Sequence, residues 1–527
     1  MFQRPTVPPE HASATQLPSL LFSGRDVDAM GMPGPVQPLD CFTDLKLDHV
    51  EATLVQGREQ YKLDEYFRRP LTTVESVTYR QAIFRDLEHP ETAAYVTEFG
   101  RRMQAMRDQL ARGRKHYYPV QQQRTFLTAA TTYVDAVSRL RDRLGEDSLD
   151  SEGLRSVLHH LSGYVDSAAF VRLSRDADET RHFMAGLQYR IRVYGDTVQV
   201  SAVDENTEDY SRDVARTFER FRQGPARSYL SKLHGYGEMD HVEATIADFV
   251  AQLHPDAFEA LAAFARRHLD FVDPGVRRLD REIQFYLAYV DLMARVTQSG
   301  LTFCCPTLSA EPDAIAVSDA YDLALASQRA ADASVVTNDI HAEAWERVLV
   351  VTGPNQGGKT TFARMFGQLH YLASLGVPVP GSQAALTLPD TVQSLFEQGE
   401  NVADMRGHLH DDLVRIHEML EISKDRTVLV VNEIFTSTAL DDATFLSTKI
   451  LNDILRRGTL CVFVTFMDEL SVLSPSTASL VAEVDPNDTD HRTFKIVRRP
   501  ADGLAHAQAV AARHGLGYDT LMSRLQA

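Results

Sequence analysis

Apolar residues recur at helical spacing through much of the first 300 residues of this chain. The spacing holds from about residue 38 to 185 and again from about 207 to 300. Met103, Met106 and Leu110, for example, lie at i, i+3 and i+7 with arginines between them, which predicts a helix with one apolar face. This part of the chain is therefore predicted to be largely α-helical.

Two stretches interrupt the helical spacing. Residues 189–205 alternate between apolar and polar positions around a Gly-Asp pair, which predicts a short β-hairpin. From about 300 to 340 the pattern is irregular and predicts no regular element. Residues 1–37, rich in Pro, Ser and Gly, are predicted to form a disordered tail.

The pattern changes again after Arg347. Short, fully apolar runs at Val348–Thr352, 428–431 and 460–465 alternate with helical stretches. Strands buried on both faces have this composition, and their alternation with helices predicts a mostly parallel sheet covered by helices.

The predicted fold is therefore multidomain. A largely α-helical core and lever region is expected over residues 38–330, with the hairpin near 189–205. An α/β domain is expected over residues 331–527.

Composition and charge restrict the class of protein and the cellular compartment that are expected. The 527 residues include 44% hydrophobic residues, enough for several cores, but no run approaches the roughly 18 apolar residues of a membrane span. The four cysteines show neither metal-binding nor disulfide spacing, so a reducing, cytoplasmic location is expected. The net charge of −19 argues against indiscriminate coating of nucleic acid, although a local basic face remains compatible with it.

The segment GPNQGGKT, residues 353–360, carries the strongest chemical signal. It matches G-x-x-x-x-G-K-[ST] between an apolar strand and a predicted helix, the context in which this P-loop motif holds nucleotide phosphates. Lys359 is expected on the β- and γ-phosphates of ATP and the Thr360 hydroxyl on Mg²⁺. The predicted nucleotide-binding residues are Gly353, Pro354, Asn355, Gln356, Gly357, Gly358, Lys359, Thr360 and Thr361.

A polar pair, Asn432 and Glu433, follows the second apolar run. P-loop enzymes place an acidic pair at this strand end, where the first residue steadies Mg²⁺ and the second polarises the attacking water. We therefore expect Asn432 to be a metal ligand, weaker than an aspartate, and Glu433 to be the general base of ATP hydrolysis.

Several segments together resemble the MutS family of DNA mismatch-repair ATPases. GPNQGGKTT (353–361) is close to that family's GPNMGGKST, NEIFTSTALDDATFL (432–446) to DEIGRGTSTYDG, and VFVTFMDELSVL (462–473) to FATHYFELT. The resemblance is specific over about 330–527 and weaker over about 40–300. It implies an ABC-type ATPase domain and a homodimer that sandwiches two ATP molecules.

The resemblance also assigns a segment that completes the partner subunit's nucleotide site. Here that segment is 399–416, in which Gly407 and His408 replace the family's Ser-Thr. His408 and Asp412, spaced i and i+4, could alternatively bind a metal, but a solvated helix start explains them more simply.

Three further positions follow from the resemblance. Asn355 corresponds to a family Asn near the nucleotide base, and Val335 to an aromatic residue that stacks on adenine. Phe466 replaces a His that contacts the γ-phosphate, and we expect it to be a plain packing residue at a strand end.

The family's mismatch-reading wedge, Phe-x-Glu, does not occur in this sequence. The expectation is a MutS-like protein that lacks the N-terminal mismatch-reading domain and gates a clamp on double-stranded or branched DNA, in mismatch repair or related DNA repair. The basic stretch Arg101 to Arg124 and the hairpin residues Arg190 and Arg192 are candidate DNA contacts. A solvated helix face and an ordinary connecting hairpin, respectively, are the alternatives. The alternative function is a nucleotide-gated protein-interaction module with little hydrolysis and no DNA partner.

Overall fold

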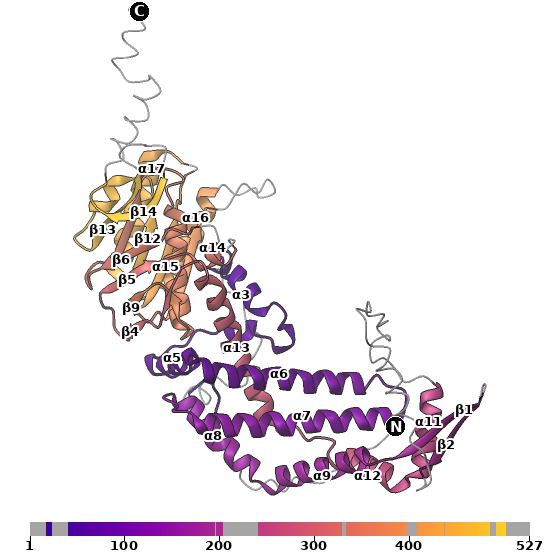
Figure 1. The fold of residues 1–527 in the computed structure, drawn as a ribbon. Helices are drawn as coiled ribbons and strands as arrows, with labels where there is room; N and C mark the ends of the chain where they lie inside the picture. The colour runs from indigo at the N-terminus through magenta and orange to yellow at the C-terminus, as the bar shows by residue number, and fades with distance from the viewer. Residues whose placement is uncertain are drawn as a thin grey trace, which may run out of the picture. The chain divides into compact units, whose positions relative to one another are not determined.

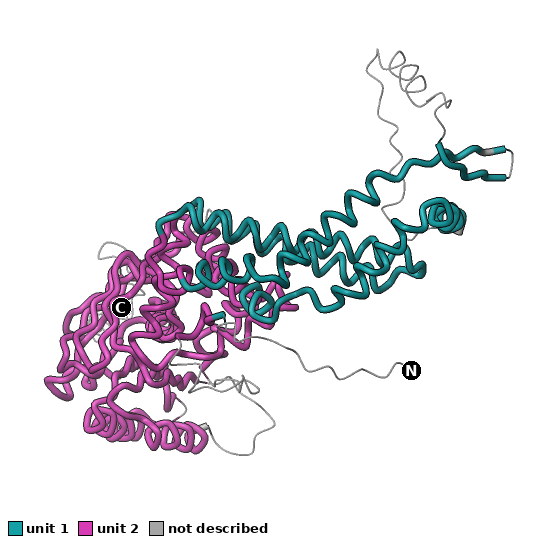
Figure 2. The backbone as a smooth tube through the Cα atoms, turned by 90° about the horizontal axis from the view of Figure 1, so that it is seen from below, with its two compact units in different colours: residues 1–17, 90–148, 156–280 teal, residues 18–89, 149–155, 281–527 magenta. Residues whose placement is uncertain are grey.

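The computed structural model describes residues 17–23, 41–194, 197–203, 241–328, 334–397, 408–436, 438–484 and 492–501. The chain forms two compact units, coloured separately in Figure 2. One unit comprises residues 1–17, 90–148 and 156–280, and the other residues 18–89, 149–155 and 281–527. The protein is thus a multidomain α/β protein. Within the described ranges, no helix is both long and apolar enough to cross a lipid bilayer.

The first unit is built on a pair of long helices. Helices α6 (Pro90–Gly113) and α7 (Pro119–Glu146) run side by side in opposite directions, joined by a short turn (Figure 1). Met103 and Met106 are buried, as the apolar spacing predicted. The remaining elements are α9 (Ala168–Ala185), β1 (Tyr189–Tyr194), β2 (Thr197–Ala202), α11 (His241–Leu253) and α12 (Pro255–Arg267). Helices α8 (Glu152–Val165) and α13 (Pro274–Thr297) have residues in both units.

Strands β1 and β2 pair antiparallel, with Tyr189 opposite Ala202 and Tyr194 opposite Thr197. The alternating pattern of residues 189–205 therefore does produce a two-stranded hairpin. The Gly-Asp turn predicted at 195–196 lies outside the described residues.

The second unit contains a six-stranded sheet of order β10-β11-β12-β7-β13-β14. The central strands β7 (Val348–Thr352), β11 (Thr427–Asn432) and β12 (Leu460–Val464) are parallel, as predicted. The outer strands are β10 (Thr391–Phe396), β13 (Thr477–Val484) and β14 (Arg492–Arg498), of which only β14 runs antiparallel to its neighbour.

Helices cover both faces of this sheet, which explains why its central strands are wholly apolar. Alternate strand residues such as Val350 and Val431 pack with residues of α16 (His408–Ile422) and α17 (Leu440–Arg457). On the other face, α15 (Lys359–Ser374) packs against β11 and β12 (Figure 1).

A second sheet occupies the stretch that the sequence pattern left irregular. Its order is β4-β9-β5-β6, and its strands are β4 (Thr307–Ser309), β9 (Gln383–Thr387), β5 (Ile315–Ala320) and β6 (Asn338–Ala342). β3 (Phe303–Cys304) pairs with β8 (Val379–Pro380), and α14 (Leu323–Gln328) follows β5. The irregular reading is therefore wrong. β3 and β4 have only two and three residues, too few to show a period, and a register shift between Val317 and Ala320 breaks the alternation of β5.

The other described helical segments of this unit are α2 (Cys41–Asp44), α3 (Leu47–Val55), η1 (Glu59–Tyr61), α4 (Asp64–Phe67), α5 (Val74–Glu88) and η2 (Asp468–Val472).

Part of the predicted N-terminal tail is structured. Leu20 and Leu21 are buried, the Ser19 hydroxyl donates to the Glu282 carboxylate at 2.9 Å, and the Leu21 carbonyl accepts a hydrogen bond from the fully buried Arg80 guanidinium at 2.6 Å. The prediction of a disordered tail over 1–37 is therefore wrong for residues 18–23. This segment is held in place by its buried leucines and by hydrogen bonds to buried polar side chains. The average composition of residues 1–37 does not reveal so short an apolar segment.

Candidate functional site

The glycine-rich loop, residues 353–358, joins the end of β7 to the start of α15. Gly353 has φ +117° and Gly358 has φ +93°, values that side chains rarely tolerate. A Cβ atom on Gly353 would lie 2.9 Å from the Ala482 Cβ, so this end of the loop also has no room for one. The loop delivers Lys359 to the first turn of α15, where unpaired backbone N–H groups favour anions.

A cavity of about 280 Å³ opens at this loop. It brings residues from three parts of the sequence together: the loop and the start of α15, the end of β11, and β14. Its lining residues are Asn355, Gln356, Gly358, Lys359, Thr360, Thr361, Glu433 and Phe494. Of the predicted site residues, Gly353, Pro354, Gly357 and Asn432 lie next to this lining in sequence but do not form part of it.

Lys359 is held by the loop itself. Its side chain is only 4% exposed, and its ammonium donates to the Gly353 carbonyl at 3.0 Å, the Pro354 carbonyl at 3.2 Å and the Asn355 Oδ1 at 3.4 Å. The same ammonium lies 3.3 Å from the Glu433 carboxylate. A buried cation with this many oxygen partners can exchange them for the oxygens of a phosphate.

Glu433 stands at the carboxyl end of β11 in an unusual backbone conformation. Its φ of +53° is rare for a residue with a side chain, and its N–H donates to the Val464 carbonyl at the end of β12 at 3.0 Å. Non-glycine residues in this region of φ and ψ cluster at functional sites because the surrounding structure must hold them there. The conformation directs the Glu433 side chain into the cavity.

Asn432 provides a test of whether the site suits Mg²⁺. The residue is 6% exposed, and its Oδ1 is buried without a hydrogen-bond partner among the residues that the structure describes. The Thr352 hydroxyl, at the same edge of the sheet, is also buried and unpaired within those residues. Mg²⁺ prefers oxygen ligands, and an unpaired buried carbonyl oxygen is costly unless it gains a partner. Together with the Thr360 hydroxyl on the cavity wall, these oxygens are of the chemical type that Mg²⁺ takes as ligands.

Phe494 is a site residue that the sequence did not reveal. It lies on β14, lines the cavity with 47% of its surface exposed, and would be in van der Waals contact with a Cβ atom added to Gly358. Asn338 of β6 fixes this part of β14, because its side chain donates to the Phe494 carbonyl at 3.2 Å and accepts from the Ile496 N–H at 2.7 Å. Phe494 is 136 positions from Gly358 in sequence, and only the sheet order brings the two together.

Other predicted positions lie apart from the cavity or outside the described residues. Val335, assigned to the nucleotide base, is half-buried and does not line the cavity. Phe466 is 49% exposed, so its reading as a packed strand-end residue is wrong: β12 ends at Val464, and Phe466 follows it at the surface.

The assigned partner-site segment 399–416 is described only from residue 408 onward. Gly407 lies outside the described residues, as does the side chain of His408. In the described part of the chain, no group of three or more His, Cys, Asp or Glu side chains is arranged to bind a metal.

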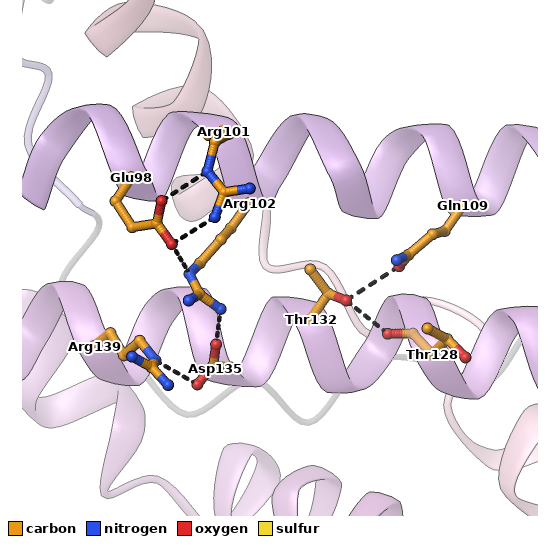
Figure 3. Close-up of polar contacts among 8 residues, drawn as sticks. All are labelled: Glu98, Arg101, Arg102, Gln109, Thr128, Thr132, Asp135 and Arg139. Atoms are coloured by element: carbon orange, nitrogen blue, oxygen red, sulfur yellow. Dashed lines mark hydrogen bonds and ion pairs between the residues drawn. The ribbon is translucent and has the colours of Figure 1, made fainter. Parts of the chain in front are cut away.

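The basic stretch Arg101 to Arg124 divides into two parts. In its first half, Glu98 binds both Arg101 and Arg102, and Arg102 also contacts Asp135 of α7 (Figure 3). Arg107 forms an ion pair with Asp280. Arg102 and Arg107 thus link α6 to Asp135 of α7 and to Asp280 of α13, whereas the exposed Arg101 pairs with Glu98 of its own helix. These pairs favour the alternative of an ordinary helix face for Arg102 and Arg107, and the DNA contact of the stretch stays a prediction. On the hairpin, Arg192 is exposed and lies opposite Gln199.

Two protein-family models match parts of this chain. A model of MutS domain V matches residues 349–510, which include the glycine-rich loop and Glu433. A model of the MutS2 N-terminal domain matches residues 72–299, and the two ranges together span more than half of the chain. The chain belongs to the MutS family. MutS domain V is itself a domain of an ATPase family.

Proposed function

We propose that this protein is a MutS-type ATPase that binds ATP with Mg²⁺, hydrolyses it, and couples nucleotide occupancy in a homodimer to DNA binding. One observation carries the proposal: the glycine-rich loop, Lys359 and Glu433 converge on a single cavity. Residues 331–527 would form the ABC-type ATPase domain, and residues 38–330 the helical region that reaches DNA. Such a protein would act in mismatch repair or a related DNA transaction in the cytoplasm.

Each residue at the cavity would have its own role in ATP hydrolysis. Lys359 and the loop N–H groups would bind the phosphate oxygens and stabilise charge as the bond to the γ-phosphorus breaks. Glu433 would accept the proton of the attacking water, and the leaving ADP oxygen would depart with its negative charge shielded by Lys359. Thr360 and Asn432 would hold Mg²⁺, which supplies further neutralisation of phosphate charge when bound.

An ATPase assay combined with a dimerisation measurement tests the proposal directly. ATP turnover would be followed with no DNA, with duplex DNA and with branched DNA, while light scattering reports the molecular mass. We expect Mg²⁺-dependent turnover that DNA changes, and a dimer that forms with ATP. Failure of the protein to retain ATP at millimolar concentration in the presence of Mg²⁺ would refute the proposed function.

A second candidate function is a nucleotide-gated protein-interaction module with little hydrolysis. Two observations favour it: an amide, Asn432, stands where an acid is usual, and Phe466 is an exposed aromatic at a strand end where the family has a His. The measurement that separates the two functions is DNA binding at low salt, which this second candidate lacks with and without ATP.

Asn432→Asp is expected to strengthen Mg²⁺ binding. A carboxylate forms a charge-assisted contact where the amide forms a neutral one, a gain of roughly 1 kcal/mol or about fivefold in the half-saturating Mg²⁺ concentration. Thermal unfolding with and without Mg²⁺ provides a readout independent of turnover, because a buried acid lowers the melting temperature until the metal neutralises it. The exposed Asn452→Asp variant is the matched control. No change in Mg²⁺ dependence would exclude Asn432 as a ligand.

Phe494→Ala is expected to weaken ATP binding by about tenfold, because stacking of an aromatic ring on another contributes about 0.5–1.5 kcal/mol beyond its buried area. Inorganic tripolyphosphate should bind equally well to both proteins, since it has no base. The exposed Phe445→Ala on α17 is the control. An equal loss of ATP and tripolyphosphate affinity would assign Phe494 to support of the loop instead of contact with the base. Titration calorimetry measures both ligands.

A further inference from the structure

The second half of the basic stretch differs from the first in its lack of acids. Residues 109–134 contain Arg112, Arg114, Lys115 and Arg124 but no Asp or Glu. In the whole chain, 73 of 527 residues are acidic, about one in seven, and the net charge is −19. A run of this length with four cations and no acid is therefore a local reversal of the protein's charge.

The structure places these cations around one turn. Helix α6 ends at Gly113 and α7 begins at Pro119, so Arg112, Arg114 and Lys115 lie at or just beyond the end of α6, while Arg124 lies in the second turn of α7 (Figure 1). All four side chains are exposed. We refer to Arg112, Arg114, Lys115, Tyr117 and Arg124 as the α6–α7 tip.

These charges are not neutralised within the part of the chain that the structure describes. There, none of the four side chains has a carboxylate oxygen within 4.0 Å of its charged nitrogens, and the only partner of Arg112 is the Asp108 carbonyl, at 3.4 Å. Further down the same helix pair, by contrast, Arg101 and Arg102 share Glu98, and Arg102 also pairs with Asp135 (Figure 3). Structural pairing explains the arginines of the first half but not the cations of the tip.

An aromatic side chain stands among the exposed cations. Tyr117 is 86% exposed, and its ring meets that of Tyr118 edge to face with centroids 5.2 Å apart. A tyrosine that exposes most of its ring gains little stability for the fold from burial. Exposed aromatic rings beside Lys and Arg are the arrangement on which unpaired nucleic-acid bases stack while the cations contact phosphates.

We propose that the α6–α7 tip binds DNA at a junction between duplex and single strand. The four cations contact backbone phosphates, and Tyr117 stacks on an unpaired base. This inference rests on the proposed DNA-dependent function and adds to it a contact surface and a preferred class of substrate. Phosphate contact predicts steep salt dependence, and stacking predicts a requirement for an unpaired base.

The first test reverses charge at the tip. Arg114→Glu with Lys115→Glu is compared with Arg143→Glu and Arg181→Glu, which change the net charge equally at exposed arginines already paired with Glu146 and Asp178. Affinity for a labelled duplex with a single-stranded tail is measured over a salt series, with circular dichroism as a check of folding. We expect the tip variant to bind at least about tenfold more weakly, with a salt slope shallower by about 1.4–1.8, since each phosphate contact contributes about 0.7–0.9.

The outcomes separate this inference from the function on which it rests. If the unmodified protein binds no DNA at low salt, both the proposed function and the tip assignment are wrong. If it binds DNA and the tip variant binds equally well, or if the control variant loses as much affinity, only the tip assignment is wrong. ATP affinity should be the same in all three proteins, because the substitutions lie outside the nucleotide cavity.

The second test removes the aromatic ring. Tyr117→Ala should weaken binding to tailed DNA by about tenfold, because stacking contributes about 1–3 kcal/mol per base, and should change binding to blunt duplex by less than about twofold. Tyr117→Phe should retain the affinity for tailed DNA. Equal losses on tailed and blunt DNA, or no loss on either, would overturn the stacking role and the preference for a junction.

Discussion

Lys359→Ala is expected to abolish ATP binding at physiological concentrations and to reduce turnover below detection. The ammonium is buried and within 3.4 Å of three loop oxygens, so it is positioned to cross-link the loop to a bound phosphate. Each charge-assisted hydrogen bond lost contributes about 1.5–3 kcal/mol, and the loss of two reduces affinity by at least about 100-fold. Equilibrium binding of a fluorescent ATP analogue measures the effect.

The control for this substitution is Lys449→Ala, which removes an exposed ammonium from α17 of the same unit. It should bind ATP as the unmodified protein does. Because Lys359 also contacts Glu433, the melting temperature of the variant should be determined first. A folded Lys359→Ala protein with unchanged ATP affinity would show that the cavity at the loop is not the phosphate site.

Glu433→Gln is expected to separate ATP binding from hydrolysis. Loss of a general base slows a reaction by about 100- to 10,000-fold, so turnover should fall by at least that lower value. Affinity for ATP should be retained or increased, because the carboxylate that lies 3.3 Å from the Lys359 ammonium no longer competes with phosphate for it. The neutral amide also removes repulsion between Glu433 and the triphosphate.

Two measurements check this expectation: single-turnover hydrolysis and the molecular mass in the presence of ATP. The variant should accumulate as an ATP-bound dimer. Glu418→Gln, an exposed substitution on α16, should behave as the unmodified protein does. Undiminished hydrolysis by Glu433→Gln would assign the base to another residue.

The sequence was most informative where local chemistry determines local structure. Val348–Thr352 coincides with β7 because a fully apolar run between charged residues and glycines has few alternatives to a buried strand. The glycine-rich loop was equally predictable, since its turns require glycine at Gly353 and Gly358. The position of Glu433 at the cavity was predictable because this residue directly follows β11, which is also a buried, largely apolar strand.

The features that were missed depend on contacts between distant parts of the chain. Phe494 reaches the cavity only because β14 pairs with β13, which pairs with β7. The packing of residues 18–23 depends on Glu282 and Arg80, and the ion pair of Arg102 across the helix pair depends on Asp135. Periodicity and composition are properties of short sequence segments, so they could not identify contact partners that lie far away in the sequence.

Asn338 ties the two sheets of the second unit together at the strand that carries Phe494. A shift of the four-stranded sheet would therefore move Phe494 at the wall of the cavity. If the cavity binds ATP as proposed, a ligand that displaces the smaller sheet would change the affinity for the nucleotide.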